Sequence, residues 1–251
     1  MASDPSTPPR LPTGFPVAEE SAPVAPGGGA GGAGIEPSLA HVVRGLGALF
    51  WGLPLSLVFS AQTARTDFFG RLGFGPALFA NLLLVYALWE LGRCGRRTPR
   101  WQAGLFRSRF LAIMMAGLTP FLQWWKVIPG RDHFQFAVFA FLLAGLLFLG
   151  HLTMLLLRLA ELLDESPLED EARLFLGVNL PLLGAVALVA CAVMAVGYSP
   201  WRPSLVVVFA PWFYRLGFGV LVMVLLPLAL NMTLVWKLKQ GLLDQAFSRP
   251  H

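Results

Sequence analysis

The chain has 251 residues, of which 56% are hydrophobic and only 13% are charged. Because an ordinary soluble domain has about 25% charged residues, water is not the main solvent of this protein. The net charge of +5 comes from arginines placed between hydrophobic stretches rather than in one patch, which argues against nucleic acid as a partner.

The N-terminal segment, residues 1–36, is rich in proline and glycine and includes a glycine run at 27–32. It has too few large apolar residues to bury a core, so we expect a disordered cytoplasmic tail. The segment also lacks the charged and apolar regions of a signal peptide. The first membrane helix is therefore expected to be an uncleaved anchor.

Six apolar stretches follow, each close to the roughly 20 residues that a helix needs to cross a hydrocarbon core of about 30 Å. They form an expected transmembrane domain over residues 37–240, followed by a short cytoplasmic tail at 241–251. The predicted fold is all-α, a polytopic membrane helical bundle with about six transmembrane helices. The expected spans are 42–61, 72–92, 107–128, 134–157, 174–197 and 216–236.

The third span has the shortest uncharged stretch, because only 16 residues separate Arg109 from Lys126. A full crossing requires these two side chains to extend towards the membrane interfaces. A re-entrant hairpin is the alternative at this position.

Two helix starts are marked by capping residues. Thr98-Pro99 precedes the third span, and Ser166-Pro167 precedes the fifth. In each pair a hydroxyl can accept a hydrogen bond from the first turn, and proline suits the first helical position. We therefore expect both helices to begin outside the membrane.

The basic residues indicate the orientation. With the N-terminus inside, 13 of the 19 Lys and Arg residues lie on the cytoplasmic side, and Arg215 lies at the outer surface. Cytoplasmic loops of membrane proteins carry such an excess. We expect both termini in the cytoplasm and the protein in the plasma membrane, which is the inner membrane of a bacterium.

A short internal repeat suggests tandem helical hairpins. The pentapeptide Arg-Leu-Gly-Phe-Gly occurs at 71–75 and again at 215–219, and the next inner basic residue follows 22 positions after each copy. Duplication of hairpins is a common origin of membrane folds. Coincidence in a chain rich in Leu, Gly and Phe is the alternative.

Polar side chains inside the last three spans form the first candidate site. They are His151, Asn179 and Asn231, with Thr153 and Thr233 close by. If these helices touch, the side chains could form one hydrogen-bonded cluster, because unpaired polar groups are costly in hydrocarbon. The cluster is either a substrate or proton site or a set of interhelical bonds worth about 0.6 kcal/mol each, and the second interpretation is favoured.

No catalytic, cofactor or metal site is predicted. Haem or zinc between helices needs further ligands, and His151 is the only histidine expected deep in a span. Ser56 and Ser60 lie mid-helix but outside a Gly-x-Ser-x-Gly setting. The nearest acid, Glu90, lies at the inner edge of the second span, which argues against a proton- or sodium-coupled pump.

Basic and aromatic side chains at the outer surface form the second candidate site. They could contact a lipid headgroup or another anionic ligand. The same mixture is typical of an aromatic belt with charged loops, which is the favoured interpretation. The candidates are Arg71, Arg131, Arg215, Trp124, Trp125 and Trp212.

The two long cytoplasmic loops carry opposite charge. Residues 93–109 contain six arginines and no acid, whereas residues 161–171 contain six acids and no base. The loops either attract each other or leave the arginines to bind anionic lipid, and the sequence favours neither.

These features favour a non-enzymatic structural or assembly component of a membrane complex, since polar groups in the spans are few and lack catalytic spacing. A small permease or substrate-binding membrane component is the alternative, and an intramembrane enzyme comes third. The expected partners are the lipid bilayer and other membrane-protein subunits. A cavity lined by His151, Asn179 and Asn231 would favour the permease, and tight packing there the structural role.

Overall fold

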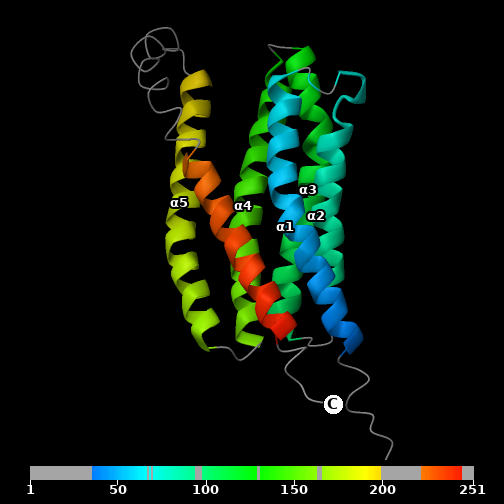
Figure 1. Ribbon diagram of the computed structural model, residues 1–251. Coiled ribbons are helices and arrows are strands. Elements are labelled where there is room, and N and C mark those ends of the chain that lie inside the picture. The colour runs from blue at the N-terminus through cyan, green and yellow to red at the C-terminus, as the bar shows by residue number, and fades with distance from the viewer. Residues whose placement is uncertain are drawn as a thin grey trace, which may run out of the picture.

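The computed structural model describes residues 36–66, 68, 70–93, 98–128, 131–162, 166–198 and 222–244. These ranges form helices and turns, with no strand among them (Figure 1). The helices are α1 (Glu36–Arg65), the 3-10 helix η1 (Gly70–Leu72), α2 (Gly75–Leu91), α3 (Pro99–Val127), α4 (Asp132–Leu162), α5 (Ser166–Tyr198) and a C-terminal helix, Val222–Asp244.

Five of these helices are long and apolar enough to cross a membrane. The exception, α2, is apolar but has 17 residues, which span about 26 Å at 1.5 Å per residue. The predicted all-α membrane bundle is therefore confirmed.

The third span is one continuous helix. It begins at Pro99, earlier than the predicted residue 107, and runs through Pro120 to Val127. The re-entrant hairpin alternative therefore does not occur. The predicted cap is present, because the Thr98 hydroxyl accepts a hydrogen bond from the Trp101 N–H across 3.2 Å. This bond pairs one of the free N–H groups of the first turn.

Other boundaries also differ from the prediction. The helix α1 begins at Glu36 and α5 at Ser166, while the last helix continues past residue 240 to Asp244. Each of these helices extends beyond its apolar stretch through polar residues. Hydropathy detects only the apolar part, so the predicted helices are too short. The predicted tail up to residue 35 and the second pentapeptide, 215–219, lie outside the described residues.

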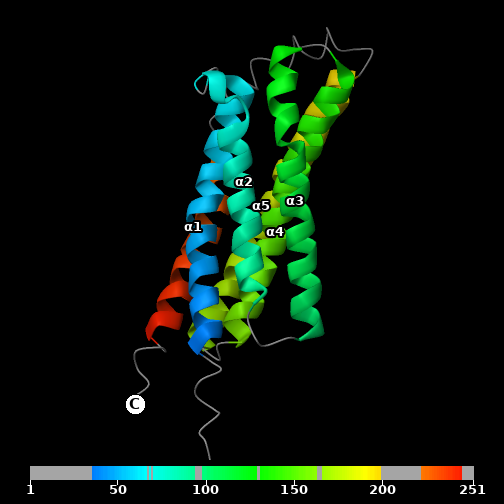
Figure 2. The ribbon, with the colours of Figure 1, turned by 90° about the vertical axis from the view of Figure 1, so that its right-hand side faces the viewer.

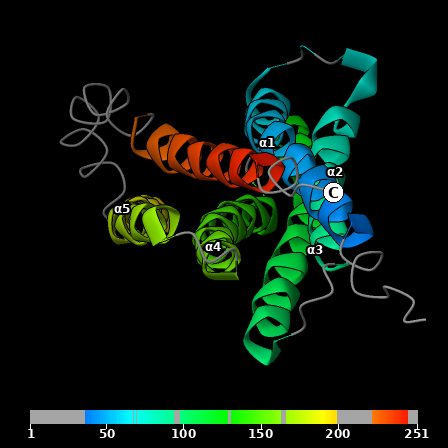
Figure 3. The ribbon, with the colours of Figure 1, turned by 60° about the horizontal axis from the view of Figure 1, so that its bottom comes forward.

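Successive helices run in opposite directions, so both ends of the described chain lie at the same end of the bundle (Figures 1 and 2). Seen towards that end, α5 stands at the edge of the bundle beside α4 (Figure 3). The C-terminal helix runs obliquely across the bundle from the side of α5 to the side of α1 (Figures 1 and 3). There, the ring of Trp236 packs 5.6 Å from that of Phe50 on α1.

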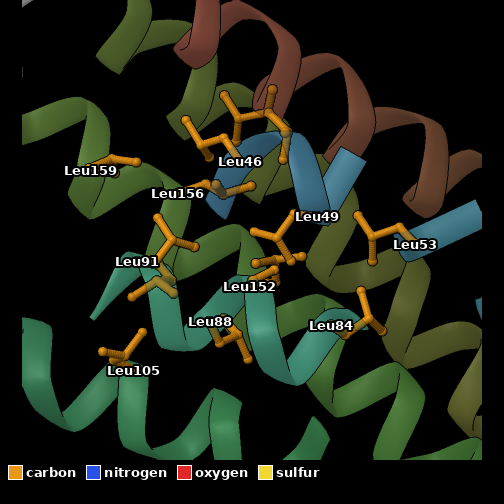
Figure 4. Close-up of a cluster of buried hydrophobic side chains, with 14 of the residues drawn as sticks. Leu46, Leu49, Leu53, Leu84, Leu88, Leu91, Leu105, Leu152, Leu156 and Leu159 are labelled. Carbon is orange, nitrogen blue, oxygen red and sulfur yellow. The ribbon is translucent and has the colours of Figure 1, made fainter. Parts of the chain in front are cut away.

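Leucines from α1, α2, α3 and α4 form the central core (Figure 4). The helices α1 and α2 approach closely because glycines of α1 face α2. A Cβ at Gly45 would lie 3.0 Å from the carbonyl oxygen of Ala87, and one at Gly52 would lie 2.8 Å from Cδ2 of Leu84. Small residues allow such close contact where the membrane supplies no hydrophobic force between helices.

The first pentapeptide forms the turn between α1 and α2. Gly73 has a φ of +55°, which L side chains rarely adopt. The next residue, Phe74, donates its N–H to Oε1 of Gln123 on α3 across 3.0 Å. The glycine and this bond together fix the start of α2 against α3.

Candidate functional site

Three helices meet at the hydroxyl of Thr153 on α4. Nδ2 of Asn179 on α5 donates to this oxygen across 2.7 Å. The hydroxyl lies 2.9 Å from Oδ1 of Asn231 and 2.9 Å from the carbonyl oxygen of Leu149 in its own helix, so these two acceptors share its single proton. Asn231 in turn donates to the carbonyl of Pro227, one turn earlier in the C-terminal helix. We call Thr153, Asn179 and Asn231 the Thr153 network, and each is only 1% exposed.

The structure thus brings together two of the three predicted side chains and does not include the third. Nδ1 of His151 lies 2.9 Å from the carbonyl oxygen of Leu147, one turn earlier in its own helix. Residues 151 and 153 point about 200° apart around α4 at 3.6 residues per turn, so they face different neighbours. The hydroxyl of Thr233 also bonds within its own helix, to the carbonyl of Ala229.

A second set of polar side chains joins the first three helices. Ser56 on α1 donates to Oδ1 of Asn81 on α2 across 2.7 Å. Nδ2 of Asn81 donates to the hydroxyl of Thr119 on α3 across 2.9 Å, and that hydroxyl donates to the carbonyl of Met115. We call Ser56, Asn81 and Thr119 the Asn81 network. Its members are 0–4% exposed, so all these bonds are shielded from solvent.

The sequence analysis did not single out Asn81 or Thr119. A signal for Asn81 existed, because an amide in the middle of the apolar stretch 72–92 needs partners inside the membrane. Thr119 carried no comparable signal, since a threonine in a helix can bond its own backbone. Its pairing with Asn81 follows only from the packing of α3 on α2.

Both networks join helices through amide and hydroxyl groups, although Oδ1 of Asn179 is buried without a hydrogen-bond partner among the described residues. Within the described residues, no group of three or more His, Cys, Asp or Glu side chains could hold a metal ion. A half-open, mainly apolar crevice of about 110 Å³ lies between α1, α4 and the C-terminal helix. Ser56 and Ser60 are on its wall, and the Ser60 hydroxyl has no hydrogen-bond partner among the described residues. The Thr153 network does not line this crevice.

A buried carboxylate links α1 and α2 at the end of the bundle that holds both described termini. Oε2 of Glu90 lies 2.6 Å from Nδ1 of His41, and Oε1 lies 3.1 Å from Nη1 of Arg93. The Glu90 side chain is only 4% exposed. Arg93 supplies the opposite charge and His41 a hydrogen bond, both of which stabilise a buried carboxylate.

Arg109 closes the C-terminal end of α2. Its guanidinium donates to the carbonyl of Leu88 across 3.0 Å and lies 5.1 Å from the centre of the Trp89 ring. A cation near a helix C-terminus pairs free carbonyls and is favoured by the helix dipole. This arginine, expected to extend towards the interface, therefore joins α3 to α2 there.

The predicted outer-face residues lie at the opposite end of the bundle, as far as they are described. The ring of Trp124 is 44% exposed and packs 5.2 Å from Phe121, at the end of α3. The basic candidates in this part of the chain are exposed. Arg71 and Arg131 occupy the turns before α2 and α4, Trp125 is half-buried, and Arg215 and Trp212 lie outside the described residues.

The described parts of the two charged loops make other contacts. Glu171 at the start of α5 pairs with Lys237 of the C-terminal helix. Arg158 on α4 donates a hydrogen bond to the backbone carbonyl of Arg100 on α3. Attraction between residues 93–109 and 161–171 stays a prediction, because 94–97 and 163–165 lie outside the described residues.

No family model, curated protein or solved structure matches this chain. Its apolar helices make it a membrane protein, and an activity has to be inferred from the described side chains. Two sets of these side chains, the Thr153 network and the Asn81 network, form hydrogen bonds between helices.

Proposed function

We propose that this protein is a non-enzymatic structural or assembly component of a membrane complex. The observation that carries the proposal is the exposure of α5. Only 17% of its apolar window is buried within the chain, against 33–44% for the other four long helices. A helix held at the edge of a bundle offers a large surface to a neighbouring subunit.

The exposed face of α5 suits helix packing. A Cβ added at Gly177 or Gly184 would meet nothing within 4 Å, so both backbones are accessible from outside. Small residues allow close approach of a second helix, and the surrounding large side chains add dispersion contacts. The exposed large apolar residues of α5 include Leu174, Val178, Leu180, Leu188, Val189 and Val193.

The Thr153 network supports the same proposal. Asn179 anchors α5 to α4 and thus sets which side of α5 faces outward. The hydroxyl shared by Asn179 and Asn231 joins three helices, and none of the three side chains lines the crevice, which favours a role in packing. The crevice between the spans, of about 110 Å³, is also smaller than the roughly 300–1,000 Å³ of typical ligand pockets, so it does not support a substrate site midway across the bundle.

The distribution of basic residues supports an orientation with both termini in the cytoplasm. Among described residues, nine Lys and Arg lie towards the end that holds both described termini, and four lie towards the other end. Basic residues collect on the cytoplasmic side of membrane proteins. The assembly face of α5 would then run from a cytoplasmic start towards the outer surface.

Crosslinking from Cys191 tests the assembly proposal, because this cysteine is exposed on α5. In native membranes carrying the Cys94→Ser variant, a bifunctional maleimide photocrosslinker on Cys191 should give a protein adduct, with a second copy or with another subunit. Adding Gly184→Leu should reduce the adduct by occupying the groove between helices.

The matched control moves the cysteine to another lipid-exposed position. Ile113 on α3 is 58% exposed, so Cys191→Ser combined with Ile113→Cys presents the same reagent to the membrane. Equal yields of protein adduct from positions 113 and 191, or a yield insensitive to Gly184→Leu, would refute α5 as the assembly face.

A further inference from the structure

A second cavity, of about 470 Å³, lies at the end of the bundle that holds both described termini. Its described lining comes from the start of α3, the end of α4 and Leu176 of α5. Two arginines and one acid face it, namely Arg100, Arg158 and Glu161. The rest of its wall includes the apolar side chains of Met154, Leu157 and Leu176. A polar mouth beside an apolar wall suits an amphiphilic ligand.

Arg158 is held in this cavity by α3. Its Nη1 donates to the carbonyl of Arg100, and a Cβ built on Gly104 would lie only 2.7 Å from that nitrogen. The guanidinium therefore lies directly over the backbone of Gly104. A Cβ at this position would require the end of the Arg158 side chain to shift.

The arrangement concentrates positive charge. A helix N-terminus carries a partial positive charge, so placing Arg158 against the start of α3 beside Arg100 is unfavourable without an anion. Glu161 is the acid that lines the cavity, and among the described contacts it forms no ion pair with either arginine. Among its described lining residues, the cavity thus has two cationic side chains and a helix terminus, opposed by the exposed carboxylate of Glu161.

We propose that this cavity binds the phosphate of an anionic phospholipid from the adjoining leaflet. Arg158, fixed by the Arg100 carbonyl, retains N–H groups for phosphate oxygens, and Arg100 adds a second guanidinium. The glycerol and first acyl carbons lie against Met154, Leu157 and Leu176. Basic cavities between helices at the membrane interface hold anionic headgroups in this manner. The site is separate from the assembly face of α5 and does not depend on it.

The test measures lipid retained by the full chain. Protein reconstituted with phosphatidylcholine and phosphatidylglycerol is released from the membrane, and bound lipid is counted by native mass spectrometry. The wild type should retain phosphatidylglycerol selectively. Arg158→Gln should lower that retention about tenfold or more, because it removes charge-assisted hydrogen bonds. The control Arg65→Gln removes an equal charge at the opposite end of the bundle, at an exposed arginine outside both candidate sites, and should leave retention unchanged.

Two further variants separate a built site from general surface charge. Gly104→Ala keeps every charge but displaces the end of the Arg158 side chain, so retention should fall. Because alanine forms helices better than glycine, this variant should fold even if Arg158→Gln folds poorly. Glu161→Gln removes the repelling carboxylate, so retention should rise. Unchanged retention in Gly104→Ala would overturn the proposal.

Two alternative occupants would also appear in this experiment. If inorganic phosphate displaced phosphatidylglycerol completely at millimolar concentration, the site would recognise a free anion and the lipid proposal would be wrong. If a crosslinker at position 154 on the cavity wall, with both arginines retained, instead captured the acidic segment 162–169 in every lipid mixture, the chain itself would fill the cavity. Selective capture of phosphatidylglycerol by the same crosslinker would support the proposal.

Discussion

The hydroxyl of Thr153 lies 2.9 Å from the amide oxygen of Asn231, and this bond joins α4 to the C-terminal helix inside the bundle. The same hydroxyl accepts a hydrogen bond from Asn179 on α5. One side chain therefore sets the rotation of three helices. A substitution of Thr153 should therefore weaken the contacts of α4 with both α5 and the C-terminal helix.

Replacing Thr153 by valine should destabilise the protein by about 1–3 kcal/mol, because the buried Nδ2 of Asn179 and Oδ1 of Asn231 both lose the hydroxyl that they contact. Thr233→Val is the matched control, since that exposed hydroxyl bonds only its own helix. Thermal unfolding in detergent measures both variants. Equal losses would show that the Thr153 network contributes no more than a local helix contact.

Two serines on α1 should respond differently to alanine. Ser56→Ala removes the donor to Oδ1 of Asn81 and should cost about 1 kcal/mol. Ser60→Ala removes a buried hydroxyl without a partner among the described residues, so stability should be unchanged or higher. Chemical denaturation of both variants tests this order. A larger loss for Ser60→Ala would contradict it and would point to a partner for that hydroxyl.

Gly45→Ala should weaken the contact between α1 and α2 by about 1–3 kcal/mol, since the new methyl group meets backbone atoms of Ala87 and Leu91 at 3.0–3.2 Å. Gly117→Ala adds the same methyl group to α3 where nothing lies within 4 Å. This control should gain up to about 1 kcal/mol from helix propensity. Melting temperatures of the pair decide the prediction, and a stabilised Gly45→Ala variant would exclude tight packing at this crossing.

The proposed orientation predicts which positions a membrane-impermeant maleimide reaches in intact cells. With Cys94 and Cys191 replaced by serine, Asp132→Cys should be labelled from outside because it begins α4 at the outer end. Gln102→Cys, on the exposed side of the first turns of α3, should react only after the membrane is opened. The reverse pattern would contradict the orientation derived from the basic residues.

Much of the fold could be predicted because it depends on local composition. The apolar stretches gave the order and approximate position of the spans, and Thr98-Pro99 marked the start of α3. Helix ends were less accurate. Hydropathy identifies only the part of a helix that lies in the membrane. A helix such as Pro99–Val127 continues beyond the membrane through polar residues, so its ends cannot be located from hydropathy.

The sequence by itself determined that this protein lies in a membrane, in what order its helices follow one another, and that some of its polar side chains need partners in the membrane. Only the tertiary structure decided which of them meet. Thr153 rather than His151 joins Asn179 and Asn231, and Asn81 pairs with Ser56 and Thr119. The reason is geometric, because hydropathy is unchanged when a helix rotates about its axis, whereas a hydrogen bond between helices is lost.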